Sequence, residues 1–235
     1  MGHFQNIARR GAAFLSALLT QDCALCAAPS GPRFLCEPCT RDLPCSDDVC
    51  PQCANPSPGG QVCGSCLTQS PHYDATTALW RYEFPLDRLI VALKYGERLA
   101  FAAYFGQTMA TTVVGRKVDL VVPMPLHPDR LRERGFNQAV EISRSVSRLL
   151  GIPQRTDALI RVRDTASQAE LPLAERTRNV RDAFLCLSDL KDLSVALVDD
   201  VMTSGATLNE AARALKRAGA AHVENWIVAR AVLKE

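Results

Sequence analysis

Eight cysteines have the spacing of ligands for two metal ions. Four C-x2-C pairs lie between residues 23 and 66, and adding 27 to each of the first four positions gives the second four. A C-x2-C turn directs two thiolates to one metal, and two such turns complete a tetrahedral set. We therefore predict two structural zinc ions, one in each repeat, held by Cys23, Cys26, Cys36, Cys39, Cys50, Cys53, Cys63 and Cys66.

Other uses of paired cysteines suit this segment less well. Disulfide frameworks are typical of small secreted domains, and here a long core-forming segment follows the cysteines. A redox C-x2-C motif opens a helix, whereas these pairs lie among Pro, Gly and Ser. Iron instead of zinc, and pairing of the first C-x2-C with the third, stay open. Cys45 lies outside the repeat and is expected to be a spare thiol, and Cys186 is expected to be a small buried apolar residue.

The stretch VALVDDVMTSGATL, residues 195–208, has the pattern of an anion site. An apolar run ends in Asp199 and Asp200, and a turn rich in hydroxyl groups leads into a helical pattern. Backbone N–H groups and the dipole at a helix start bind anions, and Gly205 allows close approach. Two carboxylates beside that anion can accept hydrogen bonds from a diol, so a sugar phosphate satisfies both halves. Without ligand, we expect solvent and the helix start to relieve the repulsion between the two acids.

Two other kinds of domain use similar pieces. A P-loop needs Lys at the helix start, and no Lys follows Gly205. A receiver domain that begins with Asp-Asp needs about 110 further residues. Only 35 residues follow Asp200, which argues against that domain.

The surrounding pattern predicts an α/β fold. Short apolar strands are expected at 75–82, 119–123, 194–198 and 223–228, and they alternate with helical patterns at 85–95, 99–113, 138–150 and 208–218. This alternation indicates a parallel sheet flanked by helices. Such sheets bind ligands at the carboxyl ends of their strands, where the two aspartates lie.

Three segments resemble known families. VALVDDVMTSGAT resembles the phosphoribosyl-pyrophosphate (PRPP) motif of type I phosphoribosyltransferases. VVPMPLHPDRLRERGFNQA, 121–139, resembles the signature of the ComF family, and the cysteine repeat is similar to that family's double zinc ribbon. Residues 159–179 match the family pattern, except that Ala169-Glu170 replaces its usual small residues and alters the expected loop geometry. The matching positions are Arg161, Thr165, Gln168, Glu175, Arg176 and Asn179.

The resemblance covers about residues 19–232 and implies the domain organisation. We expect an N-terminal helix at 1–20, a small double zinc-ribbon module at 21–67, and a type I phosphoribosyltransferase-like domain at 75–235, with a parallel sheet flanked by helices.

The resemblance also implies a site for PRPP with Mg²⁺. Asp199 and Asp200 would bind the ribose hydroxyls, at least one of them touching Mg²⁺ indirectly, and Arg161 is assigned with them as catalytic. The turn at 203–207 would hold the 5′-phosphate. The full set of expected PRPP- and phosphate-binding residues is Thr203, Ser204, Gly205, Ala206, Thr207, Pro123, Met124, Pro125 and Arg134.

Positive charge is concentrated around the expected site. Residues 116–181 contain 13 Lys/Arg against 8 Asp/Glu, whereas residues 1–70 contain 4 against 5. Arginines are suited to clamping a pyrophosphate, whose departure from an oxocarbenium-like sugar develops negative charge. The candidates lie in two loops: Arg130, Arg132, Arg134, Arg161 and Arg163.

Composition and resemblance together define the expected biology. The chain has 235 residues, 47% of them hydrophobic, a net charge of +2 and no apolar run long enough to span a membrane. The mildly basic and then apolar start is expected to be a helix rather than an export signal, so we predict a cytoplasmic protein. The resemblance implies a role in natural competence, handling incoming single-stranded DNA together with competence proteins. The alternative is an active phosphoribosyltransferase acting on a base or amine acceptor unrelated to DNA uptake.

Overall fold

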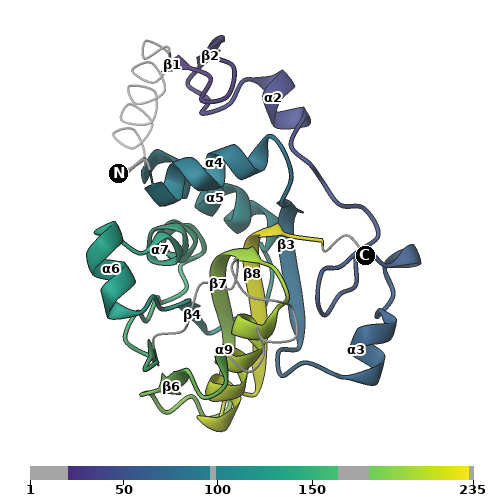
Figure 1. The fold of residues 1–235 in the computed structure, drawn as a ribbon, viewed down its shortest axis with the longest axis vertical. Helices are drawn as coiled ribbons and strands as arrows, with labels where there is room; N and C mark the ends of the chain where they lie inside the picture. The colour runs from purple at the N-terminus through teal and green to yellow at the C-terminus, as the bar shows by residue number, and fades with distance from the viewer. Residues whose placement is uncertain (1–20, 96–98, 164–179, 233–235) are drawn as a thin grey trace, which may run out of the picture. The chain divides into compact units, whose positions relative to one another are not determined.

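The computed structural model describes residues 21–95, 99–163 and 180–232 (Figure 1). It divides into two compact units, Met1–Leu43 and Pro44–Glu235. The expected N-terminal helix at 1–20 and most of the second ComF-like segment, 164–179, lie outside the described residues. Within the described part of the chain, no helix is both long and apolar enough to cross a bilayer.

The first unit contains one cysteine repeat. Strands β1 (Gln21–Asp22) and β2 (Pro29–Gly31) pair antiparallel, and helix α2 (Glu37–Arg41) begins directly after Cys36. The turn between the strands closes on Cys23, whose N–H donates to the Ala28 carbonyl over 2.8 Å. Ala27, directly after the second cysteine of the turn, has a positive φ of 58°.

The second repeat copies this geometry 27 residues later. Cys50 N–H donates to the Asn55 carbonyl over 2.8 Å, and Ala54 has a φ of 55°. Val49 and Pro56 form a β-bridge at the positions that correspond to the β1–β2 pair. After the short 3-10 helix η1 (Pro58–Gly60), helix α3 (Gly64–Thr68) begins directly after Cys63. The sequence duplication is therefore a duplication of local structure, but this second copy belongs to the larger unit.

Four parallel strands form the sheet of the larger unit, in the order β3 (Ala75–Arg81), β8 (His222–Arg230), β7 (Ser194–Met202), β4 (Leu120–Pro123). This confirms the predicted parallel sheet. Strand β7 runs four residues beyond its predicted end at 198, so the two aspartates belong to the strand rather than to the loop after it.

Helices pack along the sheet and explain why its strands are apolar at nearly every position. Helices α4 (Leu86–Tyr95), α5 (Leu99–Thr112) and α7 (Gln138–Leu150) pack with one another and with the strands, and α9 (Ala206–Arg217) packs on β7 and β8 (Figure 1). The four central residues of β7, 195–198, are fully buried, as expected for a strand covered on both faces.

Two parts of this unit have no counterpart in the predicted pattern. Helix α6 (Pro128–Arg134) contains one apolar side chain, Leu131, so no helical periodicity marks it. Strands β5 (Leu159–Arg161) and β6 (Phe184–Cys186) form a two-stranded antiparallel sheet of three residues each. Cys186 is half-buried at the end of β6 rather than buried as expected.

Candidate functional site

The two adjacent aspartates point to opposite faces of the sheet. Side chains alternate along a strand, and Val195 and Leu197 pack in the core cluster that contains the apolar face of α9. Asp199 has the same phase and faces the α9 side. Asp200 has the opposite phase and lies on the side of α4 and α7. The two carboxylates nevertheless stay close enough to interact, and both line one cavity.

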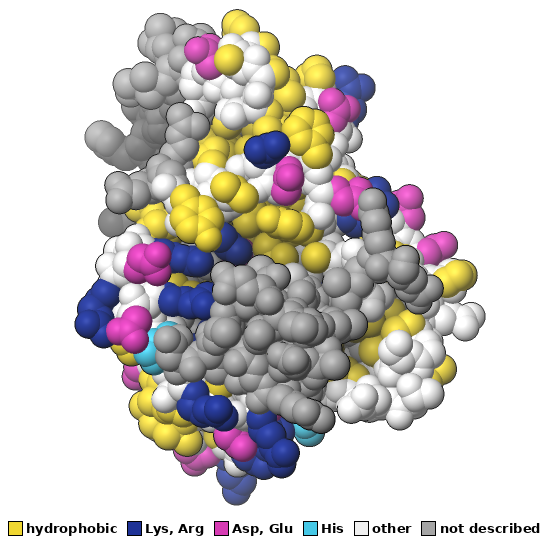
Figure 2. Space-filling view, in the orientation of Figure 1, with side chains coloured by type: hydrophobic (Ala, Val, Ile, Leu, Met, Phe, Trp, Pro, Cys, Tyr) yellow, Lys and Arg dark blue, Asp and Glu magenta, His cyan; other side chains and the backbone are white. Residues whose placement is uncertain are grey.

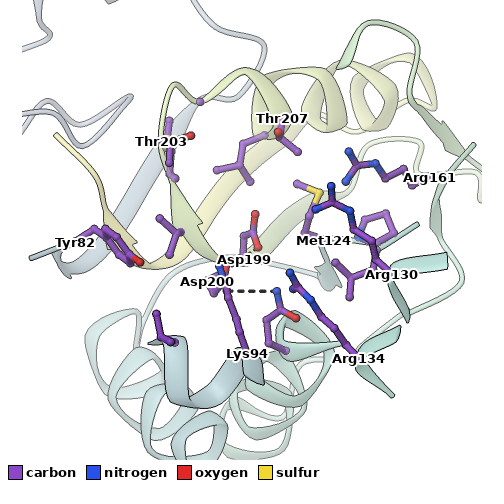
Figure 3. A pocket seen from close by; sticks show the side chains of 18 of the residues that line it. Tyr82, Lys94, Met124, Arg130, Arg134, Arg161, Asp199, Asp200, Thr203 and Thr207 are labelled. Carbon is purple, nitrogen blue, oxygen red and sulfur yellow. Dashed lines mark hydrogen bonds and ion pairs between the residues drawn. The ribbon is translucent and has the colours of Figure 1, made fainter. Parts of the chain in front are cut away.

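Asp200 is buried and already paired. Its Oδ2 lies 2.9 Å from Lys94 Nζ on α4 and accepts a hydrogen bond of 3.3 Å from Gln138 Nε2 on α7 (Figure 3). Only 4% of Asp200 is exposed. Burial alone lowers the pKa of Lys94, but the charge and hydrogen bond of Asp200 outweigh burial and raise the pKa above its ordinary value. The expectation that solvent relieves the repulsion at Asp200 is therefore wrong, because the partly buried Lys94 ammonium group on α4 does so.

Asp199 keeps contact with a cavity and differs electrostatically from its neighbour. Its Oδ1 accepts the backbone N–H of Asp200 over 2.8 Å. Burial first, and then the charge of Asp200, raise the pKa of the Asp199 carboxyl well above its ordinary value. The pair thus combines one carboxylate anchored by Lys94 and Gln138 with one whose raised pKa makes it hold a proton more readily than an ordinary aspartate.

The turn after β7 has the geometry predicted for an anion site. Gly205 has a φ of 81° and directly precedes α9, and as the N-cap residue it has no side chain to cap the helix start. The Ser204 hydroxyl accepts the Ala206 N–H over 3.3 Å. A side chain at position 205 would be strained by this φ, and its Cβ would lie 2.7 Å from Met202 Cε. Glycine is therefore required here by the backbone and by the packing beneath it.

Asp199 and this turn face a cavity of about 410 Å³ whose rim is cationic (Figure 3). Lys94 lines it from α4, Arg130 and Arg134 from α6, and Arg161 from β5. The Arg134 guanidinium lies 5.5 Å from the centre of the Tyr95 ring, and that of Arg161 lies 5.7 Å from the centre of the Phe184 ring. Aromatic faces thus support two of the four cationic groups at the cavity.

The structure brings most of the predicted site residues together. Those that line the cavity are Asp199, Asp200, Arg161, Thr203, Gly205, Thr207, Met124, Pro125 and Arg134. Pro123 ends β4 and lines a neighbouring cavity, and Ser204 and Ala206 lie in the turn itself. Two predicted arginines make other contacts: Arg132 pairs with Asp129 on its own helix, and Arg163 Nη1 donates to the Arg181 carbonyl over 2.7 Å.

Four further residues of the site escaped prediction: Lys94, Gln138, Tyr82 and Tyr95. Lys94 could have been identified from the sequence, because it lies four residues after Ile90 and eight after Leu86, on the side of α4 that faces the core. A cation on a buried stripe implies a buried anion.

The RGFNQ segment after α6 now has a physical explanation. Gly135 ends α6 with a φ of 74°. Asn137 begins α7 by accepting the Ala139 N–H over 2.9 Å, and its amide donates to the Met124 carbonyl over 3.0 Å. Gln138 then reaches Asp200. The motif therefore fixes the chain after β4 against the end of β7, beside the cavity.

Both cysteine repeats assemble into metal-binding geometry. In each set of four, all sulfurs lie within 4.8 Å of one another. Tetrahedral zinc with bonds of about 2.3 Å separates its sulfurs by about 3.8 Å, and the Cys26–Cys36 and Cys53–Cys63 sulfurs are 3.7 and 3.6 Å apart. Each repeat supplies its own four thiols, so the alternative pairing of the first C-x2-C with the third is excluded.

The chemistry of the thiols also fits a divalent cation. Burial tends to raise the pKa of Cys50, but three backbone N–H groups outweigh it and lower the pKa to about 7. In the same cluster burial, together with the neighbouring thiols Cys53 and Cys63, raises the pKa of Cys66 far above its ordinary value. The first thiol of the cluster therefore loses its proton easily, whereas the last one resists deprotonation. A bound zinc ion stabilises all four thiolates and removes this resistance.

Comparison with known proteins gives the same two parts in the same order. The double zinc ribbon domain model matches residues 14–67, and the phosphoribosyl transferase domain model matches residues 136–232.

Three similar proteins cover most of the chain. The DNA utilization protein YhgH of Escherichia coli is 32% identical over 88% of this chain and 96% of its own length. Competence protein F of Haemophilus influenzae is 34% identical over 73% of this chain and 79% of its own. Competence protein ComFC of Bacillus subtilis is 29% identical over 77% and 78%. Together with the two domain matches, these similarities show that the chain belongs to the ComF family, as a double zinc ribbon followed by a phosphoribosyltransferase domain.

Proposed function

We propose that the cavity at the carboxyl ends of β4 and β7 binds PRPP or a related sugar phosphate. One observation carries the proposal: the helix-start turn, the protonatable carboxyl of Asp199 and four cationic side chains all face the same cavity. A sugar phosphate presents a phosphate, a diol and further anionic groups in one molecule. No single simple anion uses all three features.

Each group has a distinct role in this proposal. Residues 203–207, called the phosphate turn below, hold the 5′-phosphate with backbone N–H groups and the hydroxyls of Thr203 and Thr207. Asp199 accepts hydrogen bonds from the ribose diol. Arg130, Arg134 and Arg161 hold the pyrophosphate, where guanidinium groups bind two oxygens at once.

Asp200 has a different role from the one that its position next to Asp199 implies. Its oxygen already binds Lys94 and Gln138. We assign it to holding Lys94 at the cavity wall, so that the ammonium faces the anionic ligand with its own charge partly balanced. This arrangement keeps a cation beside the site without leaving it buried and unpaired.

Mg²⁺ suits this site when it arrives with the ligand. The cavity offers oxygen donors, namely the Asp199 carboxylate and the Thr203 and Thr207 hydroxyls, and hard cations prefer oxygen. Mg²⁺ neutralises phosphate charge and stabilises a departing pyrophosphate. A metal held by one carboxylate together with ligand phosphates is the usual mode for Mg²⁺.

The biological role that we propose is natural competence, through handling of incoming single-stranded DNA. The printed names of the similar proteins point to DNA utilization and competence. The surface supports a nucleic-acid partner: Tyr95 and Phe84 are 72% and 75% exposed, and Tyr82 and Tyr95 line the same cavity as the arginines. Figure 2 shows hydrophobic side chains gathered beside Lys and Arg on this face. Aromatic rings beside cations are what single-stranded DNA requires.

The second candidate function is an active phosphoribosyltransferase with an unrelated acceptor. It is favoured by the aromatic and apolar wall formed by Tyr82, Val91 and Tyr95, which lines the same cavity as the phosphate turn and suits a planar base. Both candidates use the same cavity, but only this one requires chemistry.

Two assays separate these candidates. Fluorescence anisotropy with labelled single-stranded DNA at 50 and 200 mM salt measures DNA binding, which should weaken steeply with salt if phosphates are bound. Pyrophosphate release from PRPP and Mg²⁺ measures transfer, with nucleobases, amines and DNA offered as acceptors. DNA binding that Tyr95→Ala and Arg134→Ala weaken supports the competence role. Pyrophosphate release with a small acceptor, and no DNA binding, would overturn it in favour of the transferase.

A further inference from the structure

The second four-cysteine cluster lies directly behind the phosphate turn, and three sets of contacts join them. The cluster belongs to the same compact unit as the sheet, and its turn at 50–53 is bonded to the edge of β3, where Thr76 N–H donates to the Pro51 carbonyl over 3.0 Å. From this position it reaches the residues on both sides of Gly205.

Arg230 makes the first connection. Only 4% of this residue is exposed, at the end of β8. Its Nε donates to the carbonyl of Cys53, a predicted metal ligand, over 2.8 Å. Its Nη1 donates to the carbonyls of Met202 and Ala231 over 2.9 Å each, and also to that of Thr203. One guanidinium therefore ties the metal cluster to the first residue of the phosphate turn.

Tyr73 makes the second connection. Its ring is buried in the cluster formed with Cys50, Cys53 and Cys66. Its hydroxyl lies 3.3 Å from the position that a Cβ on Gly205 would take. The floor of the turn is thus a side chain that packs against the metal ligands.

The segment just after α3 makes the third connection. His72 N–H donates to Asn209 Oδ1 over 2.6 Å, and Asn209 N–H donates to the Gly205 carbonyl over 2.9 Å. The first turn of α9 is thereby held by the chain that leaves the last cysteine of the cluster.

The charge of the metal site explains why these contacts would depend on bound metal. A zinc ion with four thiolates carries a formal charge of about −2, and Arg230 is a buried cation that donates only to carbonyl oxygens among the hydrogen bonds described. A charged metal–thiolate cluster beside it offsets the cost of burying the guanidinium. Loss of metal removes the charge that balances Arg230.

We propose that the second four-cysteine site positions the phosphate turn, with Arg230 as the positioning residue that couples them. The inference rests on the proposed function, because it assigns the turn to phosphate. The first four-cysteine site, in the other compact unit, supplies an internal control with the same ligands and the same local geometry. Coupling is reciprocal in binding free energy, so PRPP must raise the zinc affinity of the second site and leave that of the first unchanged. We expect the tighter second site to release its zinc more slowly.

The ligand-free arm of the test measures zinc release from the full chain into a chromogenic chelator. The Cys23→Ser variant keeps only the second site. Its zinc-release curve therefore shows which kinetic phase of the parent chain belongs to which site. Arg230→Met should speed release from the second site about tenfold or more and leave the first unchanged. Arg230→Lys should behave like Arg230→Met, since a single nitrogen cannot take the places of both Nε, which bonds Cys53, and Nη1, which bonds Met202. Met109→Ala is the matched control, because it loosens the same unit at a fully buried position away from both sites.

The ligand arm measures PRPP–Mg²⁺ affinity by calorimetry and repeats the release assay with PRPP bound. We expect Arg230→Met to weaken affinity about tenfold or more and to abolish protection of the second zinc. Cys23→Ser and Met109→Ala should keep parental affinity. Equal affinity in Arg230→Met and the parent, or equal zinc release in Arg230→Met and Met109→Ala, overturns the coupling. Absence of PRPP binding in the parent defeats the proposed function instead, and the zinc-release arm still decides whether Arg230 holds the cluster.

Discussion

At the scale of single residues, the Asp199–Asp200 pair shows how a strand accommodates two adjacent acids. The alternation of side chains gives the two acids different partners, although their charges still interact: Asp200 raises the pKa of Asp199. Asp200 binds Lys94 and Gln138 in a buried site, and Asp199 faces the cavity. The sequence suggests that the two acids act together. In the structure Asp200 holds Lys94 and Gln138, and Asp199 is the candidate group for binding the ligand.

Replacing Lys94 with Met should destabilise the fold on the order of 3 kcal/mol, because it leaves Asp200 buried without its counter-charge. The free energy of unfolding in urea measures this cost. Arg132→Met is the control, since Arg132 pairs with Asp129 on an exposed surface and should cost less than about 1 kcal/mol. The double variant Lys94→Met/Asp200→Asn should recover much of the loss. If Lys94→Met and Arg132→Met lowered the free energy of unfolding by equal amounts, the role of Lys94 would be refuted.

Binding of PRPP with Mg²⁺ should strengthen as the pH rises. Burial and the charge of Asp200 raise the pKa of Asp199, so the carboxyl of the empty site holds its proton at lower pH. A diol or cation favours the ionised form, and binding must then release that proton; affinity therefore increases as pH rises toward the raised pKa and levels off above it. Calorimetry in buffers of different ionisation enthalpy should record this release. In Asp199→Asn only the ligand's own phosphate ionisation should remain, and an identical pH profile in both proteins would contradict the assignment.

At the scale of elements, the turn between β7 and α9 combines two separate demands on Gly205. Its φ is 81°, and a Cβ would lie 2.7 Å from Met202 Cε. Gly115 has a similar φ of 85° with no atom within 4 Å of a Cβ. We expect Gly115→Ala to cost about 1 kcal/mol from backbone strain alone. Gly205→Ala should cost up to about 1 kcal/mol more, because the flexible end of Met202 must move aside, and should weaken PRPP binding as well. Equal unfolding free energies, with PRPP affinity intact in both, would show that the turn tolerates a side chain.

Sequence periodicity predicted the elements that bury an apolar face. Helix α7 has its predicted bounds, and β3, β4, β7, β8, α4 and α5 lie where the apolar pattern places them. Helix α6 was not predicted because it has almost no apolar side chains. Strands β5 and β6 were not predicted because three residues are too few to show an alternating pattern. Among site residues, the phosphate turn and the acids were visible as a local motif. Lys94 and Gln138 became visible only with the tertiary contacts that bring α4 and α7 to β7.

At the scale of the whole molecule, two repeats that are equivalent in sequence have unequal surroundings. Both form the same knuckle and the same cluster of four cysteines, yet the first lies in the small unit and the second packs in the core of the sheet unit. Spacing predicts the ligands of each site, because ligation is local. Spacing does not predict the hydrogen bond between Arg230 and Cys53, because the two residues lie 177 positions apart in the chain.

Metal analysis should find close to two zinc ions in each purified chain. Cys23→Ser should leave one, since Cys23 belongs to the first set of four. Cys45→Ser should keep two, because Cys45 is exposed and lies outside both sets. Loss of the same amount of zinc in both variants would show that the ligand assignment is wrong, and iron in place of zinc would correct the identity of the ion.

The most direct test of the central claim is the free energy of unfolding of the sheet unit with and without PRPP and Mg²⁺. A ligand that binds only the folded state at 100 times its dissociation constant adds about 2.7 kcal/mol. We predict a gain of this size in the parent chain and the loss of most of it in Asp199→Asn, which keeps the shape of the side chain but removes the charge that accepts the diol. An unchanged unfolding curve for the parent at millimolar PRPP and Mg²⁺ would contradict the claim that this cavity binds a sugar phosphate.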